Sequence, residues 1–341
     1  MLLLQKIRLS QFRCFEKLTI EITHPIVVIT GCNGSGKTSL LEAIYCCSFS
    51  KSFRISDSSI LKNHHAEGFA IELEGLDNQG DSWNIKRIEH KEKKNFFINN
   101  KRAATYKQVF STFRTIAMSE EDLTIIHGSP ENRRTFLDKA IALHEGDYIE
   151  LLQQQKKIIA QKQALLRSQN PQKCVFELFN EKQQDLDTLI RKKRIEYGQK
   201  LIQESLSINS NIQIINSEIR FKYESFQTTD SFTIEKQAGR VLSGSHKDNP
   251  QILLNDESSR YFASRGQQKA LLTLLKLGQI HLLNKPCILL IDDYLTDLDK
   301  DKAKQILKIL SKQQIQIFIA SPMIDTANEL IKEFSHQMIR L

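Results

Sequence analysis

Apolar and polar residues alternate along much of the first hundred positions of this 341-residue chain. Around a Gln-Phe-Arg centre, residues 4–22 read LQKIRLSQFRCFEKLTIEI, a period-two pattern that predicts two strands. Three more alternating stretches follow, separated by turn-forming Asp, Asn and Gly residues. They are FAIELEG (69–75), DSWNIKRIE (81–89) and NFFINNKR (95–102). This region therefore predicts an antiparallel meander.

The middle of the chain has the longer period of helices. Leu151, Ile158 and Leu165 lie seven apart, and after an Asn-Pro break a second apolar stripe runs through residues 186–201. The pattern predicts a helical hairpin, too short for a long coiled-coil arm. Its basic run, residues 191–194, fits either a nucleic-acid contact or a solvated helix face.

The last third returns to alternating strands and helices. Residues 287–291 and 315–320 are short apolar runs that predict buried strands, and residues 300–312 and 325–334 predict helices. Such alternation is typical of a parallel sheet.

The stretch GCNGSGKTSL, residues 31–40, fits the phosphate-loop pattern G-x-x-x-x-G-K-[ST]. It follows the apolar run PIVVIT (25–30), a predicted strand, and leads into SLLEAIY (39–45), a predicted helix. In this arrangement backbone N–H groups point at phosphates, Lys37 reaches the terminal ones, and the Thr38 hydroxyl binds Mg²⁺. The alternative is an ordinary glycine-rich turn. The residues predicted to hold the nucleotide are Gly31, Cys32, Asn33, Gly34, Ser35, Gly36, Lys37, Thr38 and Ser39.

A carboxylate pair ends the predicted strand at 287–291, in the sequence LLIDDYLTDLD. Asp292 stands at the carboxyl edge of the sheet, from which it can hold Mg²⁺. Asp293 can orient or deprotonate an attacking water. The alternative is an acidic turn in which Asp297 and Asp299 cap the next helix. A phosphate loop in the same chain favours the metal site.

A second anion-binding surface is predicted at FASRGQQK, residues 262–269. Ser264 and Gly266 open a leucine-rich helix, so a hydroxyl, a backbone N–H and a helix N-terminus meet there. Alone, this is an N-capped helix. With the loop and the Asp pair it resembles the S-x-G-Q signature of ABC-type ATPases, whose serine and glycine contact the γ-phosphate held by the opposite subunit. The resemblance implies ATP-dependent dimerisation.

Composition adds weaker constraints. Apolar residues make up 40% of the chain, enough to bury the core of one large domain or two joined ones, and no apolar stretch is long enough to span a bilayer. The net charge of +8 favours a polyanionic partner, although an ordinary surface carries similar charge. Six cysteines without C-x-x-C spacing fit a reducing, cytoplasmic setting without signal peptide or membrane anchor.

Seven segments of the chain together carry a closer resemblance. They are FRCFEKLTIEI, GCNGSGKTSLLEAIY, KSFRISDSSIL, SEEDLTIIHGSPENRRTFLD, GSHKDN, YFASRGQQKALLTLLKL and LLIDDYLTDLD. In this order and at about this spacing they resemble the RecF family of the SMC-like branch of ABC ATPases. Transporter ATPase subunits share only the loop, the signature and the strand end, so HGSPENRRTFLD and FASRGQQ make the resemblance specific.

The resemblance implies an α/β fold, an ABC/SMC-like ATPase head with a phosphate-loop mixed sheet and an antiparallel meander. Residues 1–118 and 208–341 would form the head, and 119–207 a short inserted helical lobe. The implied function is ATP-dependent DNA binding in recombinational repair and replication restart. An ATP-induced homodimer would bind single-stranded or double-stranded DNA at gaps, help RecA to load together with RecO and RecR, and leave after slow, DNA-stimulated ATP hydrolysis. The implied location is the cytoplasm, at the nucleoid.

The family's functional residues transfer to matching positions. Arg13 corresponds to the arginine that approaches the bound phosphates, and Asp299 to the dimer-interface loop. Lys37, Asp293 and Ser264 would be the catalytic residues, and Thr38 and Asp292 the metal ligands. The partner's γ-phosphate would be contacted by Ser264 and Gly266, and Gln267 would belong to the same nucleotide-binding set.

Two positions depart from the family pattern, Ser245 and Glu120, where proline is usual. The main rival hypothesis is an ATP-gated scaffold of the SMC-like type, in which hydrolysis is incidental. A membrane-transporter subunit is disfavoured, because nothing in the chain suggests a surface that docks on a transmembrane partner. Arg133 and Arg134 fit either DNA phosphates or salt bridges to the acidic residues 120–122.

Overall fold

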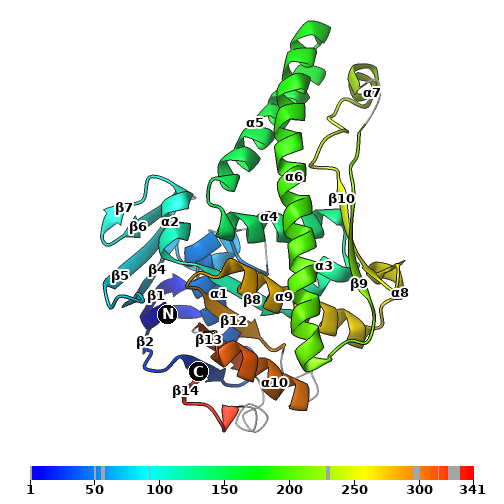
Figure 1. The fold of residues 1–341 in the computed structure, drawn as a ribbon. Coiled ribbons are helices and arrows are strands. Elements are labelled where there is room, and N and C mark those ends of the chain that lie inside the picture. Colours follow the sequence, from blue (N-terminus) through cyan, green and yellow to red (C-terminus); the bar gives the residue numbers. More distant parts are fainter. Residues whose placement is uncertain are drawn as a thin grey trace. The chain divides into compact units, whose positions relative to one another are not determined.

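The structure is a computed structural model of the chain, and it describes residues 2–49, 51–54, 58–91, 93–227, 231–294, 300–313, 315–321 and 331–341. The chain divides into two compact units (Figure 1). The first unit comprises Met1–Glu121 and Asn284–Leu341, and the second unit comprises Asp122–Leu283.

A five-stranded parallel sheet, of order β14-β3-β13-β12-β8, lies in the first unit. Its strands are β3 (Ile26–Thr30), β8 (Thr115–Ser119), β12 (Ile288–Asp292), β13 (Gln316–Ser321) and β14 (His336–Arg340). Every residue of the first four is buried, which explains their continuous apolar runs. Helix α1 (Lys37–Phe49) packs against β8, β12 and β13. The predicted buried strands are confirmed.

A six-stranded antiparallel sheet, of order β2-β1-β4-β5-β6-β7, completes the β structure of this unit. Its strands are β1 (Leu3–Phe12), β2 (Phe15–Glu21), β4 (Gly68–Leu76), β5 (Ser82–His90), β6 (Lys93–Ile98) and β7 (Lys101–Arg102). Along β4, buried residues alternate with half-buried ones, as a sheet with one covered face requires. The predicted hairpin and meander are confirmed.

Short helices link these strands, and one predicted helix cannot be compared with the structure. The helices are the 3₁₀ turns Ser58–Leu61 and Glu120–Leu123, together with α2 (Tyr106–Thr112) and α10 (Lys300–Ser311). Helix α10 confirms the helix predicted at 300–312. The helix predicted at 325–334 lies mostly outside the described residues.

A buried amide joins the two sheets of the first unit. Gln316 on β13 is 1% exposed. Its Oε1 accepts a hydrogen bond from the Leu4 N–H at 2.7 Å, and its Nε2 donates to the Leu4 carbonyl at 3.0 Å. One side chain therefore satisfies both backbone groups of a residue on β1. This contact ties the N-terminal strand to the C-terminal part of the parallel sheet.

The second unit is mainly helical. Its helices are α3 (Thr124–His127), α4 (Pro130–His144), α5 (Tyr148–Leu166), α6 (Lys173–Ile212), α7 (Ser231–Ala238), α8 (Ser259–Phe262) and α9 (Arg265–Leu283). Its three-stranded sheet has the order β11-β10-β9. These strands are β9 (Ile219–Glu224), β10 (Asn249–Leu254) and β11 (Glu257–Ser258). Helices α5 and α6 pack along each other and confirm the predicted helical hairpin (Figure 1).

The division of the chain differs from the predicted one at its second boundary. We expected residues 208–341 to belong to the head, but the structure places the boundary after Leu283. The reason is packing: α9 lies along α6, while β9 contacts α6 and β10 contacts α4, so residues 208–283 bury their apolar side chains in the second unit. The first boundary follows Glu121, close to the expected residue 118.

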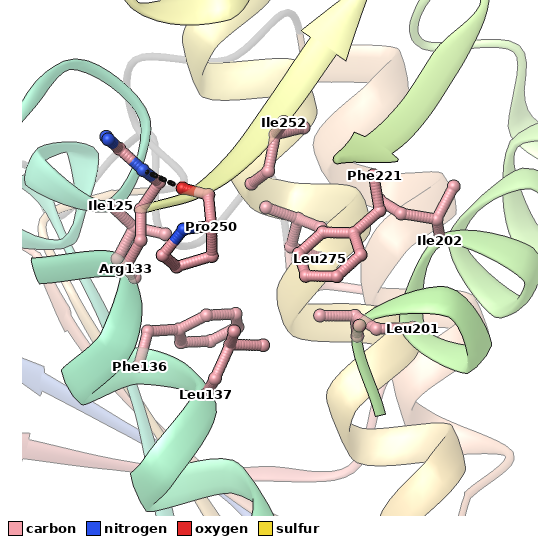
Figure 2. A pocket seen from close by; sticks show the side chains of 11 residues that line it. Ile125, Arg133, Phe136, Leu137, Leu201, Ile202, Phe221, Pro250, Ile252 and Leu275 are labelled. Carbon is pink, nitrogen blue, oxygen red and sulfur yellow. Dashed lines mark hydrogen bonds between the residues drawn. The ribbon is translucent and has the colours of Figure 1, made fainter. Parts of the chain in front are cut away.

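A small apolar cavity lies in the core of the second unit. Figure 2 shows Phe136, Leu201, Phe221 and Leu275 pointing into it from α4, α6, β9 and α9. Its volume is about 10 Å³, enough for one water molecule at most. We therefore regard it as a packing gap and assign no ligand to it. Among the described residues, no helix is long and apolar enough to cross a membrane.

Replacing Gln316 with Leu should destabilise the chain, because it leaves both the N–H and the carbonyl of Leu4 without their buried partner. We expect a loss of about 1–3 kcal/mol in the free energy of unfolding, measured by urea titration. Gln313→Leu is the matched control, since the hydrogen bond of Gln313 is made by its backbone. Equal stability of the two variants would contradict the proposed tie between the sheets.

Candidate functional site

The loop between β3 and α1 contains the predicted phosphate-binding residues. Gly34 and Gly36 have φ angles of +85° and +103°, which favour glycine. A Cβ on Gly36 would also lie 2.8 Å from the Cys14 Sγ and 2.5 Å from the Phe15 ring. A Cβ on Gly34 would meet nothing within 4 Å, so this side of the loop is open to an approaching ligand. The predicted strand, loop and helix are confirmed.

Lys37 folds back over this loop. It begins α1, its side chain is buried, and its Nζ donates hydrogen bonds to the carbonyls of Gly31 at 2.9 Å and Cys32 at 3.0 Å. A cation is thus held beside the N-terminus of a 13-residue helix. Helix dipole, loop N–H groups and ammonium all favour a bound polyphosphate.

The Thr38 hydroxyl donates a 2.9 Å hydrogen bond to the Asp292 carboxylate. Thr38 lies in the first turn of α1 and Asp292 is the last residue of β12. They meet because β3 and β12 are parallel strands whose carboxyl ends reach the same sheet edge. These are the two side chains that the sequence predicts as metal ligands, and the structure brings them into direct contact.

Burial raises the pKa of Asp292 to about 6, with smaller contributions in the same direction from the negative charges of Asp293 and Glu121. The hydrogen bond from Thr38 and the charge of Arg54 oppose this shift. A carboxylate whose anion is disfavoured, next to a hydroxyl oxygen, fits Mg²⁺, which would restore the anion. The described residues contain no cluster of three or more His, Cys, Asp or Glu side chains that could hold a metal. Phosphate and water oxygens would complete the Mg²⁺ shell.

Asp293 follows directly and has a φ of +52°, an unusual conformation for a residue other than glycine. Its N–H donates to the Ala320 carbonyl on β13 at 3.2 Å. Backbone strain of this kind collects at functional sites, where the surrounding structure enforces it. Asp297 and Asp299, the acidic residues considered for helix capping and for the dimer interface, lie outside the described residues.

Arg13 is not hydrogen-bonded to the loop. It lies in the turn between β1 and β2, and its guanidinium donates to both oxygens of the Glu42 carboxylate, at 2.7 and 2.8 Å, and to the Ile60 carbonyl at 3.0 Å. Glu42 is fully buried in α1 and also accepts a hydrogen bond from the Ser52 hydroxyl. The phosphate contact of Arg13 stays a prediction. Its chain neighbours Cys14 and Phe15 border Gly36 in the loop.

Glu42 was missed in the sequence analysis, although the sequence contains a signal. It is the one acidic residue in the apolar helical run SLLEAIY, residues 39–45. A buried carboxylate requires a charged or hydrogen-bonding partner, so a single acid on a buried helix predicts one. The pattern does not say which cation supplies it.

Ser264 caps α9 in the second unit. Its Oγ accepts a hydrogen bond from the Gln267 N–H at 3.3 Å, and its own N–H donates to the Gln267 Oε1 at 2.9 Å. This is a reciprocal capping arrangement. Ser264, Arg265 and Gly266 are exposed, and a Cβ on Gly266 would meet nothing within 4 Å. The helix N-terminus is capped and still open to an anion from outside.

The two arginines considered for DNA or salt bridges have other partners. Arg133 donates to the carbonyls of Pro250 at 2.5 Å and Gly128 at 2.9 Å. Arg134 donates to the Asp248 carbonyl at 2.6 Å. Both therefore hold backbone on or next to β10. In the basic run 191–194, three side chains form ion pairs within the chain: Arg191 with Asp248, Lys193 with Glu145, and Arg194 with Asp138.

The departure at Ser245 is accommodated by a buried polar network. Ser245 is fully buried, its Oγ donates to Asp187 at 2.8 Å, and it accepts a hydrogen bond from Gln155. Burial lowers the pKa of the neighbouring His246 to about 4, so this histidine is neutral at physiological pH. The network links α5, α6 and the GSHKD segment in a structural role.

Comparisons with known proteins agree with this geometry. The sequence model of the RecF/RecN/SMC N terminal domain matches residues 3–340. The DNA replication and repair protein RecF of Clostridium beijerinckii is 27% identical over 347 residues, covering 96% of this chain and 94% of that protein.

Solved structures extend the comparison to the fold. The recombination mediator protein RecF with ATP, from the RecFOR pathway, superposes with a TM-score of 0.87 at 25% identity, covering 94% of this chain and 92% of that one. An SMC head bound to the C-winged helix domain of ScpA has a TM-score of 0.56 at 13% identity and covers 96% and 91%, which supports the fold alone. The predicted ABC/SMC-like ATPase head fold is confirmed.

Asp292→Asn should stabilise the chain without nucleotide, and more so at about pH 8 than at about pH 5. The folded-state pKa of Asp292 lies above the ordinary value of 3.8, so above about pH 6 the folded chain must keep a buried anion. Asn is neutral and still accepts the Thr38 hydrogen bond. We expect the stability difference between variant and wild type to grow by roughly 1–3 kcal/mol between the two pH values, by urea unfolding. A pH-independent difference would show that burial does not perturb this carboxyl group.

Proposed function

The chain belongs to the RecF/RecN/SMC N-terminal domain family, and on this basis we propose that it is an ATP-dependent DNA-binding protein of recombinational repair and replication restart. The observation that carries the proposal is the 2.9 Å contact between Thr38 and Asp292, beside a loop shaped for phosphates. Similarity to RecF along nearly the whole chain supports it.

In this proposal the first unit binds ATP. Loop N–H groups and Lys37 would hold the phosphates, and Thr38 and Asp292 would hold Mg²⁺, whose chemistry there would be to neutralise phosphate charge. Asp293 orients a water for attack on the γ-phosphorus and accepts its proton as the bond to the leaving ADP oxygen breaks. The carboxyl group of Asp292, whose pKa is raised, is better suited to bind the metal than to act as the general base, because a bound Mg²⁺ would keep it ionised.

The second unit supplies the other half of a composite site. Ser264, Gly266 and Gln267 contact the γ-phosphate held by a second copy of the chain, so two ATP molecules close a homodimer. The open approach to Gly266 and the exposed Ser264 support this role. ATP thereby controls assembly, and slow, DNA-stimulated hydrolysis reverses it.

The closed dimer binds DNA next to single-stranded gaps. The net charge of +8 supports contacts to phosphates, so binding should be salt-dependent and nearly independent of sequence. The RecF relative of known structure belongs to the RecFOR pathway. We extend this to the present chain as cooperation with RecO and RecR in loading RecA, in the cytoplasm at the nucleoid.

Nucleotide-dependent dimerisation can be tested by size-exclusion chromatography with light scattering. We expect wild type to be monomeric alone and dimeric with ATP and Mg²⁺. Lys37→Met should stay monomeric because it loses phosphate binding, and Ser264→Arg because a bulky cation blocks the surface that meets the partner's phosphate. Ser264→Arg should still bind ATP as a monomer, which separates the two causes. If the wild-type protein has the same molar mass with and without ATP and Mg²⁺, the proposed function is contradicted.

Asp293→Asn distinguishes turnover from scaffolding. The amide cannot accept the proton of the attacking water, so ATP hydrolysis should fall steeply while ATP-induced dimers persist. If release by hydrolysis matters, cells carrying this variant should lose DNA repair, measured as survival after ultraviolet damage. Full survival with undetectable hydrolysis would favour the alternative, an ATP-gated scaffold in which hydrolysis is incidental.

A further inference from the structure

Two adjacent aromatic side chains stand out from the surface of the second unit. Tyr261 is 71% exposed and Phe262 is 68% exposed, the highest values among the large hydrophobic residues that the structure describes. They end helix α8, which packs against β10 and α3. The Arg260 guanidinium lies 5.1 Å from the centre of the Tyr261 ring. Exposed aromatic residues beside an arginine have the composition of an interface anchor.

The position of this pair limits what can cover it. Phe262 precedes Ser264 by two residues, so their Cα atoms are at most about 7.6 Å apart. Any molecule that closes on the exposed Ser264 and Gly266 must therefore also approach Phe262. The aromatic pair and the proposed phosphate-contacting residues are therefore exposed neighbours along one short segment.

We propose that Arg260, Tyr261 and Phe262 form an aromatic anchor that packs against a second copy of the chain, beside the nucleotide held by that copy. The inference rests on the proposed function, because it takes the ATP-bound copy as the occupant. Charge supports this choice. The surface around the bound nucleotide would offer phosphates and the exposed Glu120 to Arg260, whereas Glu121 beside it pairs with Arg54.

A single-stranded nucleic acid is the less suitable occupant. Stacking platforms for single strands combine aromatic residues with several accessible cations along a groove. Arg133 lies near Arg260 and Tyr261, but its guanidinium donates to the backbone carbonyls of Pro250 and Gly128. Arg260 and Arg265 are the exposed arginines of this segment, and two cations on one short stretch do not make the phosphate track of a single-strand groove.

The test compares ATP-induced dimerisation of wild type, a Tyr261→Ala/Phe262→Ala variant and a matched control. The control, Leu178→Ala/Phe226→Ala, removes two exposed apolar side chains from elsewhere in the same unit. Sedimentation over a protein concentration series, with ATP and Mg²⁺, gives the dimer dissociation constant. We expect it to rise about tenfold or more for the anchor variant and to change little for the control. ATP affinity of the monomer, measured at low protein concentration, should be unchanged.

The outcomes separate this inference from the proposed function. If wild type dimerises with ATP and the anchor variant does so equally well, the inference is wrong and the proposed function stands. If the anchor variant dimerises normally but binds single-stranded DNA less well, the surface belongs to nucleic acid and the inference is also wrong. If wild type does not dimerise, the proposed function fails first. Recovery of dimerisation by Tyr261→Phe/Phe262→Tyr would support an aromatic contact.

Discussion

The buried carboxylate of Asp292 is the constraint around which the first unit is organised. Four apolar residues of β12 bring it to the sheet edge, where burial disfavours its charge. Thr38 reaches it from 254 positions away, because the parallel sheet ends β3 and β12 at one edge. A cation bound there would remove the cost of the anion. Nucleotide and metal binding would therefore stabilise the same contact that holds the loop helix to the sheet.

The N-terminal hairpin depends on the same helix. Arg13, in the turn of that hairpin, is fixed to α1 by its paired hydrogen bonds with Glu42, and Cys14 and Phe15 border Gly36 in the loop. At the other end of β1, Leu4 is held by Gln316 of the parallel sheet. The antiparallel sheet is thus attached at both ends of β1, to α1 at one end and to the parallel sheet at the other. If phosphate binding changed the loop conformation and shifted α1, the position of Arg13 would change with it, because Arg13 is bonded to Glu42 of that helix.

Local patterns in the sequence were sufficient for the strand, loop and helix around Gly36 and for the position of Asp292, because glycine spacing and apolar runs are short-range signals. Packing between segments distant in the sequence could not be predicted from these patterns. Residues 208–283 belong to the second unit because α9 packs on α6, and no periodicity records that choice. Ser245 replaces an expected proline because Asp187 and Gln155, distant in sequence, bind its hydroxyl. Arg133 binds carbonyls of the chain itself, a partner that charge patterns cannot reveal.

ATP is proposed to control DNA binding, and the most direct measurement of this control is fluorescence anisotropy of a labelled duplex with a single-stranded gap. The titration is made with and without ATP and Mg²⁺, at salt concentrations from about 50 to about 200 mM. The account predicts tight binding only with ATP, an affinity that falls steeply with salt, and the same affinity for a gapped duplex of unrelated sequence. Equal binding without nucleotide, or binding that salt does not weaken, would contradict it.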